Sequence, residues 1–273
     1  MKALALLLAT VFGLAAPTPV EYLGSRQVEG GGFAEPGSQP TPGLTAWAVI
    51  GLRAAGSSGQ ALADAGTYLE GSGERLGSAT DLELVLVARA ALGHKPADLI
   101  GRVKALEQPS GAIGPTVNST IWGLLALRAV GERASPATVR YLLRRQHRSG
   151  GWSWIQGGAP DSNDTAAAIQ ALRAAGVRGA PIRRALGYVR RHANPDGGFE
   201  LTEGRGSDVQ STAWAMQAFL AAGERPPAPA RRYLERMRRP DGSFRYSARY
   251  VTTPVWVTAQ ALAALSGRSL PLR

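Results

Sequence analysis

One pattern constrains the fold of this chain more than any other: an Ala- and Leu-rich run that ends in glycine and recurs six times. The runs end at Gly56, Gly93, Gly131, Gly176, Gly223 and Gly267. Subtracting these numbers gives spacings of 37, 38, 45, 47 and 44 residues. A period of this size has room for two helices in each repeat. The sequence therefore predicts about six helix-pair repeats.

The glycine-terminated runs and the segments between them predict two kinds of helix. Runs such as 121–131 consist of good helix formers, are apolar on almost every side, and end in a residue suited to the left-handed position after a helix. Segments such as 137–146 and 181–191 have apolar residues three and four apart, with arginines between them. A first helix of this second kind is expected at about 19–27. We expect an inner ring of buried helices inside an outer ring with one wet face.

A glycine-rich turn with a large apolar residue follows most of the outer segments. These apolar residues are Phe33, Ile113, Trp152, Phe199 and Phe244. The second repeat has no clear copy. Glycine permits a tight turn, and the large side chain can fill the gap between neighbouring helix pairs. We interpret these residues as structural.

One of these turns carries a known motif. The segment Gln146-His147-Arg148-Ser149-Gly150-Gly151-Trp152 matches the QxxxGxW pattern of the squalene-cyclase and prenyltransferase repeat superfamily, and weaker copies occur in the other repeats. The chain resembles this superfamily over nearly all of residues 17–273. The resemblance implies an all-α fold, an α/α toroid (α6/α6 barrel) around a central cavity. Transcobalamin-like binding proteins use a similar barrel, so the resemblance speaks for architecture more than for chemistry.

The segment 161–166, DSNDTA, resembles the DxDDTA motif that protonates the substrate in squalene-hopene-type cyclases. The family has its proton-donating acid at the third position, where this chain has Asn163. A neutral amide cannot deliver a proton to an alkene, which argues against the family's chemistry. Asp161 and Asp164 remain candidate acids, because a neighbouring like charge can raise one pKa. Helix capping is the structural alternative. With Asp81 and Asp208, which precede other inner runs, these residues would form an acidic rim at one mouth of the barrel.

Four inner segments carry tryptophan near their starts. These residues are Trp47, Trp122, Trp214 and Trp256. If they point inward, they form an aromatic wall suited to an apolar or cationic ligand, and packing between helices is the alternative. Gln170 and Gln217 each lie six residues before the glycine that ends their run, and they are candidate polar contacts inside the cavity.

The N-terminus predicts export. A basic start, Met1-Lys2, precedes an apolar run that reaches Ala16, which is the pattern of a signal peptide. The run is shorter than the roughly 20 residues that a membrane-spanning helix needs. We therefore expect a signal peptide over 1–16, a toroid domain over 17–273, no transmembrane helix in the mature chain, and a secreted or extracytoplasmic location. A buried first helix is the alternative.

The charge balance and the missing residue types limit the classes of partner that the chain is expected to bind. The net charge is +11, nearly all the positive charge is arginine, and anionic lipid or cell-wall polymer would suit it. Nucleic acid is not expected, because the aromatic residues of a nucleic-acid groove are missing. The absence of cysteine excludes disulfides and thiolate chemistry. The three histidines, at 94, 147 and 192, show no metal-binding spacing and are interpreted as surface residues, so no metal or cofactor is expected.

Two functional hypotheses follow. The first is a secreted binding protein that holds a hydrophobic small molecule or a peptide in the toroid. Export favours this hypothesis, because isoprenoid diphosphates are cytosolic and an exported enzyme would not meet them. The second is a cyclase or lyase that uses Asp161 or Asp164 as its acid. The binding hypothesis depends on a closed ring. An open solenoid is the alternative, but it would expose the apolar faces of its terminal repeats, and neither end leaves room for a polar cap. We therefore expect the first and sixth repeats to pack on each other.

Overall fold

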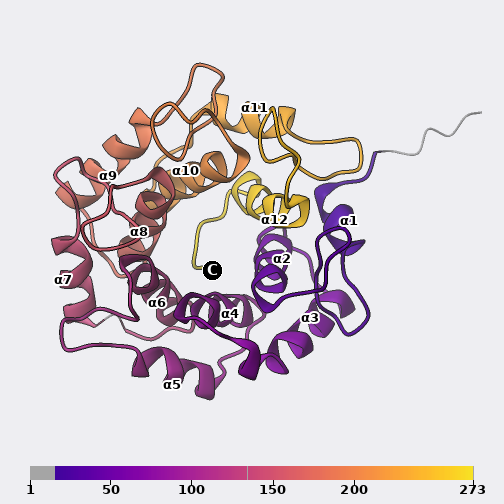
Figure 1. The fold of residues 1–273 in the computed structure, drawn as a ribbon, viewed down its shortest axis with the longest axis horizontal. Coiled ribbons are helices and arrows are strands. Elements are labelled where there is room, and N and C mark those ends of the chain that lie inside the picture. The colour runs from indigo at the N-terminus through magenta and orange to yellow at the C-terminus, as the bar shows by residue number, and fades with distance from the viewer. Residues whose placement is uncertain (1–15, 134, 273) are drawn as a thin grey trace, which may run out of the picture.

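The computed structural model describes residues 16–133 and 135–272, and this part of the chain contains twelve α-helices in two concentric rings (Figure 1). The inner ring consists of α2 (Pro42–Ala54), α4 (Ala79–Ala91), α6 (Val117–Ala129), α8 (Ser162–Ala174), α10 (Val209–Ala222) and α12 (Pro254–Leu265). The outer ring consists of α1 (Pro19–Gly24), α3 (Gln60–Glu70), α5 (Ala97–Ala105), α7 (Pro136–Arg144), α9 (Ala180–Arg191) and α11 (Ala228–Arg236). The predicted α/α toroid of six helix pairs is confirmed. The predicted signal segment lies outside the described residues except for its last residue.

The inner helices begin and end where the sequence pattern places them. The first five begin after a residue whose side-chain oxygen accepts a hydrogen bond from a first-turn amide. These capping residues are Thr41, Ser78, Thr116, Asp161 and Asp208. All six glycines that follow the inner helices have φ between 69° and 90°, a left-handed conformation that glycine adopts without strain.

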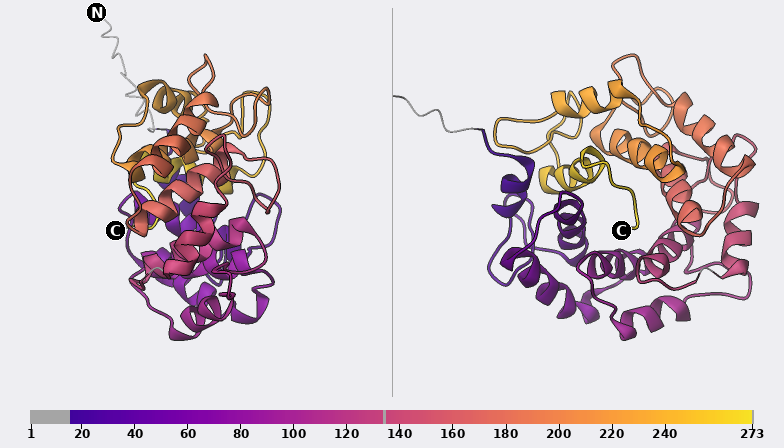
Figure 2. Two further views of the ribbon diagram at one scale, coloured as in Figure 1. Left: turned by 90° about the vertical axis from the view of Figure 1, so that its left-hand side faces the viewer. Right: turned by 180° about the vertical axis from the view of Figure 1, so that it is seen from behind.

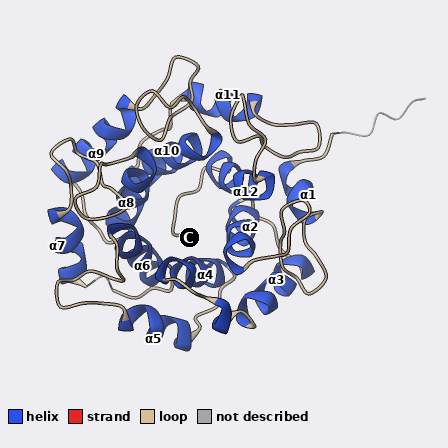
Figure 3. Ribbon diagram, viewed as in Figure 1, coloured by secondary structure: helices blue, strands red, loops and turns tan. Residues whose placement is uncertain are grey.

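The five apolar turn residues are buried, which agrees with the structural role predicted for them, and each joins its turn to the following inner helix. Phe33, Ile113, Trp152, Phe199 and Phe244 are all at most 1% exposed. The backbone N–H of each donates to a threonine hydroxyl on the following inner helix, at 2.9 to 3.1 Å. In the second repeat a short 3-10 helix, η1 (Gly73–Arg75), stands where the turn would be. Helices and turns thus form one connected scaffold (Figure 3).

The ring is closed. A Cβ placed on Gly51 of α2 would lie 2.6 Å from the carbonyl oxygen of Ala259 in α12, so the two helices touch backbone to backbone. The carboxylate of Glu35 accepts hydrogen bonds from the first-turn amides of Val255 and Trp256, at 3.0 and 2.9 Å. The first and sixth repeats therefore pack on each other, as closure requires.

A tail after α12 turns back into the ring (Figure 2). Its Leu270 is 2% exposed and donates its backbone N–H to the side-chain oxygen of Gln170, at 2.7 Å. Because Gln170 lies in the second half of α8, the tail covers the mouth formed by the C-terminal ends of the inner helices. The sequence pattern did not indicate this segment.

Two further observations concern a histidine expected at the surface and helices that could span a membrane. His192 is buried rather than at the surface, because its ring packs against the ring of Tyr188 with a centroid distance of 4.6 Å and an angle of 35° between the ring planes. Within the described residues, no helix is both long and apolar enough to cross a bilayer.

Candidate ligand-binding cavity

A cavity of about 480 Å³ lies at the mouth formed by the N-terminal ends of the inner helices. All six inner helices contribute to its wall, as do two loops. Its lining residues are Trp47, Thr80, Leu84, Asn118, Trp122, Trp154, Asp161, Asn163, Asp164, Ala167, Leu201, Gln210, Trp214, Trp256 and Gln260. We call it the tryptophan cavity. It contains all four predicted tryptophans together with Asp161, Asn163 and Asp164.

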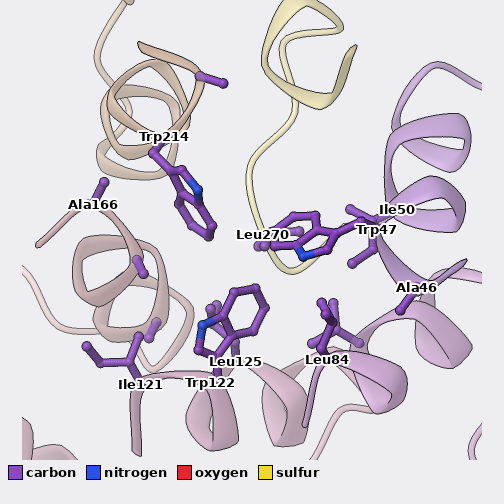
Figure 4. Close-up of a cluster of buried hydrophobic side chains, with 14 of the residues drawn as sticks. Ala46, Trp47, Ile50, Leu84, Ile121, Trp122, Leu125, Ala166, Trp214 and Leu270 are labelled. Carbon is purple, nitrogen blue, oxygen red and sulfur yellow. The ribbon is translucent and has the colours of Figure 1, made fainter. Parts of the chain in front are cut away.

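Three of the lining tryptophans extend toward one another from different inner helices (Figure 4), and we call these three the tryptophan floor of the cavity. Trp47, Trp122 and Trp214 contact one another edge to face, with ring centroids 5.6 to 5.9 Å apart and ring planes 87° to 90° apart. Each is the sixth residue of its helix, and the three helices alternate around the ring. The residue at the same place in α4 is Leu84 and in α8 is Ala167, which leave space for the rings. The tryptophans therefore both pack together and line the cavity.

An acidic pair lies on the wall at the start of α8. Asp161 is the N-cap of the helix, and its Oδ1 accepts the backbone N–H of Asp164 at 2.8 Å. Asp164 is 5% exposed and accepts a 2.6 Å hydrogen bond from the side-chain amide of Asn118. Burial, and next the charge of Asp161, raise the pKa of Asp164 to about 8, although the bond from Asn118 acts in the opposite direction. Asp161 therefore caps α8, and the buried carboxyl group of Asp164 lies beside it in the cavity wall.

Two amide side chains in the wall have unused hydrogen-bonding capacity. Gln260 is 3% exposed and Asn118 is 4% exposed. Neither polar atom of the Gln260 side chain has a partner in the described part of the chain, and the same holds for Oδ1 of Asn118. A buried polar group without a partner costs about 1 to 3 kcal/mol. A ligand that bonds to these atoms would remove that cost.

Gln260 and Asn118 were not among the residues predicted from the sequence, although a signal for them was present. Each lies four residues from a tryptophan, Gln260 after Trp256 and Asn118 before Trp122, so each pair shares one face of its helix. An amide on the same face as a predicted cavity tryptophan is itself a candidate for the cavity wall.

The other four candidate residues lie outside the tryptophan cavity. Gln170 bonds to the tail and lines a cleft of about 270 Å³ beside it. Gln217 is buried and is not part of the wall. Asp81 accepts from the Ser78 hydroxyl at 2.8 Å. Asp208 caps α10, lines a groove between the segments 204–207 and 246–252, and has its pKa raised by burial. Of the four aspartates expected at the rim, only Asp161 and Asp164 line the tryptophan cavity.

The lining contains no basic residue, although the chain carries 31 lysines and arginines. Asp161 and Asp164 are its only acidic residues. Across the described ranges, no group of three or more His, Cys, Asp or Glu residues is arranged to hold a metal ion. The cavity thus combines five indole rings, an acidic pair and several neutral amides.

Comparison with known proteins identifies the fold. No family model and no curated protein matches the sequence. Among solved structures, the type II terpene cyclase MstE from Scytonema matches with a TM-score of 0.64 at 18% identity, over 91% of this chain and 95% of that one. The ent-copalyl diphosphate synthase from Streptomyces platensis matches with a TM-score of 0.60 at 19% identity, over 83% and 50%. A glycosidase in complex with glucose matches with a TM-score of 0.63 at 14% identity, over 91% and 94%. The chain has the terpenoid cyclase-like toroid fold, and that fold carries more than one chemistry.

Proposed function

We propose that this chain is an extracytoplasmic binding protein that holds a small molecule with an apolar body in the tryptophan cavity. The observation that carries the proposal is the Gln260 amide, which is buried in an aromatic wall with both polar atoms unused. Ligand sites are typically apolar pockets with a few convergent polar groups. A structure of MstE holds geranylgeranyl dihydroxybenzoate, a molecule with an apolar chain and a polar head. That occupancy supports a ligand of similar character here.

Two features favour binding over the family's cyclisation. Asn163 lines the cavity at the position where the resembling cyclases have their acid, and an amide does not donate a proton to an alkene. The three floor tryptophans are only 5% to 8% exposed. Their indole groups therefore fill the centre of the toroid and leave a bowl-shaped cavity at one mouth. Such a bowl can hold a compact ligand against the rings.

The test is a ligand search followed by a matched pair of substitutions. Native mass spectrometry of protein purified from its own host should reveal a bound molecule, and its titration into the emptied protein should change tryptophan fluorescence. Gln260→Met should weaken binding about tenfold, since a lost hydrogen bond is worth about 1.4 kcal/mol. Gln217→Met is the control, because Gln217 is equally buried but lies outside the wall. Equal losses in both variants, or no ligand at all, would contradict the proposal.

Acid catalysis is the second candidate, and the raised pKa of Asp164 favours it. With a pKa of about 8, this carboxyl group is largely protonated at neutral pH and faces an aromatic wall suited to a developing cation. Incubation with squalene or polyprenyl substrates tests the idea. Product formation should fall as pH rises above 8 and should be lost in Asp164→Asn. Activity that survives replacement of both Asp161 and Asp164 by alanine would reject these roles.

A further inference from the structure

The tryptophan cavity has an unbalanced charge. The whole chain carries a net charge of +11, yet the only ionisable side chains in the cavity wall are Asp161 and Asp164. Neither carboxylate takes part in an ion pair with a basic side chain among the described residues. Any negative charge on this pair is therefore uncompensated by the protein itself.

The aromatic residues add to the negative potential. The face of an indole ring carries partial negative charge and attracts cations, more strongly when water is excluded. Trp47, Trp122 and Trp214 use part of their surface on one another, and Trp154 and Trp256 complete the wall without joining that cluster. Five indole rings and two carboxyl groups thus surround one volume of about 480 Å³.

We propose that the ligand of the tryptophan cavity is an organic monocation with apolar substituents, such as a quaternary ammonium compound, whose charge lies beside Asp161 and Asp164. This inference rests on the proposed binding function and names its ligand class. The apolar substituents contact the indole rings, and a hydroxyl or carbonyl group of the ligand bonds to the free Gln260 amide. Oδ1 of Asn118, which has no partner in the described chain, adds a further partial negative charge.

Binding of a cation is linked to a proton. Among the described residues, the charged group that acts on Asp164 is Asp161 at the start of its own helix. Tyr188 on α9 interacts with Asp161, and burial chiefly raises the pKa of Tyr188 to about 12, so this group stays neutral. The neighbouring α6 and α10 present the neutral Asn118 and Gln210 to the cavity, and Asp208 at the start of α10 is bonded to Ser211. A cation beside Asp164 lowers its pKa from about 8, so binding at neutral pH releases a proton. Affinity for a cation therefore rises as pH is raised from 6 to 9.

The experiment compares cations with neutral molecules of the same shape. Calorimetric titrations of the full chain would use choline against 3,3-dimethyl-1-butanol, and benzyltrimethylammonium against its neutral carbon analogue. We expect each cation to bind at least tenfold more tightly than its neutral partner, and more tightly at pH 9 than at pH 6. Repeating the titrations in buffers of different ionisation enthalpy should detect release of a fraction of a proton at pH 7.

A pair of variants tests the assignment to Asp164. Asp164→Asn should remove the pH dependence and weaken cation binding at pH 9 about tenfold. Asp98→Asn removes the same charge from the exposed surface of α5 and should leave binding unchanged. If Asp164→Asn does not fold, the cation and neutral pairs and the proton release of the unaltered chain decide alone. Equal binding of cations and neutral molecules without proton release would overturn the cationic ligand and leave the binding function standing. No binding of any probe, with no ligand from the native host, would overturn both.

Discussion

Glu83 is a residue whose burial works against its ionisation. It is 0% exposed, and neither of its carboxyl oxygens has a hydrogen-bond partner among the described residues. Its side chain lies against α6, where a Cβ placed on Gly123 would be 3.0 Å from Oε1. Burial raises the pKa of Glu83 from 4.5 to about 10, so the folded protein holds this group in its neutral form.

This raised pKa predicts a stability that falls with alkali. The folded state keeps the Glu83 proton between pH 4.5 and about 10 while the unfolded state loses it, so the free energy of unfolding decreases across that range, by up to about 1.4 kcal/mol per pH unit. Asp164 contributes in the same direction up to about pH 8. Urea unfolding at pH 5, 7 and 9 should show a smaller decrease in Glu83→Gln. The exposed Glu29→Gln variant is the control, and equal slopes in all three proteins would contradict the prediction.

The helix starts show where local sequence is sufficient and where it is not. Asp161 and Asp208 were recognisable as capping residues because a cap acts within three residues of its own helix. The start of α12 has no such residue, and Thr253 before it has a φ of 42° and makes no side-chain cap. Its first-turn amides are instead satisfied by Glu35, about 220 residues away in sequence. No local pattern could have revealed this partner.

Removing this distant cap should weaken the junction between the first and last repeats. Glu35→Ala removes the hydrogen-bond acceptor of two backbone N–H groups in the first turn of α12. Loss of a capping side chain typically costs about 0.5 to 2 kcal/mol of stability. Thermal unfolding should therefore show a lower midpoint for Glu35→Ala than for the original chain. Glu29→Ala, an exposed change in the same connection, should leave the midpoint in place. A midpoint for Glu35→Ala that matches this control would show that the cap contributes nothing to closure.

The whole ring was predictable because its sequence signals, the glycine-terminated runs, recur periodically. The tail carries no repeated signal, so it could not be predicted. Six glycine-terminated runs predicted the six helix pairs that the structure contains. The alternation of Trp47, Leu84, Trp122, Ala167 and Trp214 at one helical position also lies in the sequence, and it explains how three large rings fit in one centre. The bond between Leu270 and Gln170 joins residues 100 apart with no repeated spacing.

The tryptophan cavity opens at one mouth of the ring and the tail covers the other mouth, so removal of the tail should open a channel to the far side of the three tryptophans. Leu270 belongs to the same apolar cluster as Trp47 (Figure 4). Deleting residues 268–273 exposes that side of the cluster and leaves the Gln170 side-chain oxygen without its bond, at a cost of about 2 to 4 kcal/mol. Water then reaches the tryptophan floor from the mouth formed by the C-terminal ends of the inner helices. Tryptophan emission should shift to longer wavelength, and acrylamide should quench it more strongly than in the intact chain.

A milder variant distinguishes detachment of the tail from a general loss of stability. Gln170→Leu removes the hydrogen bond to the tail and places an apolar side chain of similar size against it. The tail should therefore detach more often, although the chain keeps its full length. Both proteins should retain helical circular dichroism at 20 °C, because the helix pairs and their turns do not depend on the tail. We expect quenching to increase in the order intact chain, Gln170→Leu, truncated chain. Unchanged quenching in a truncated chain that remains helical would mean that the tryptophan floor is already sealed by the inner helices, and that the tail does not close the channel.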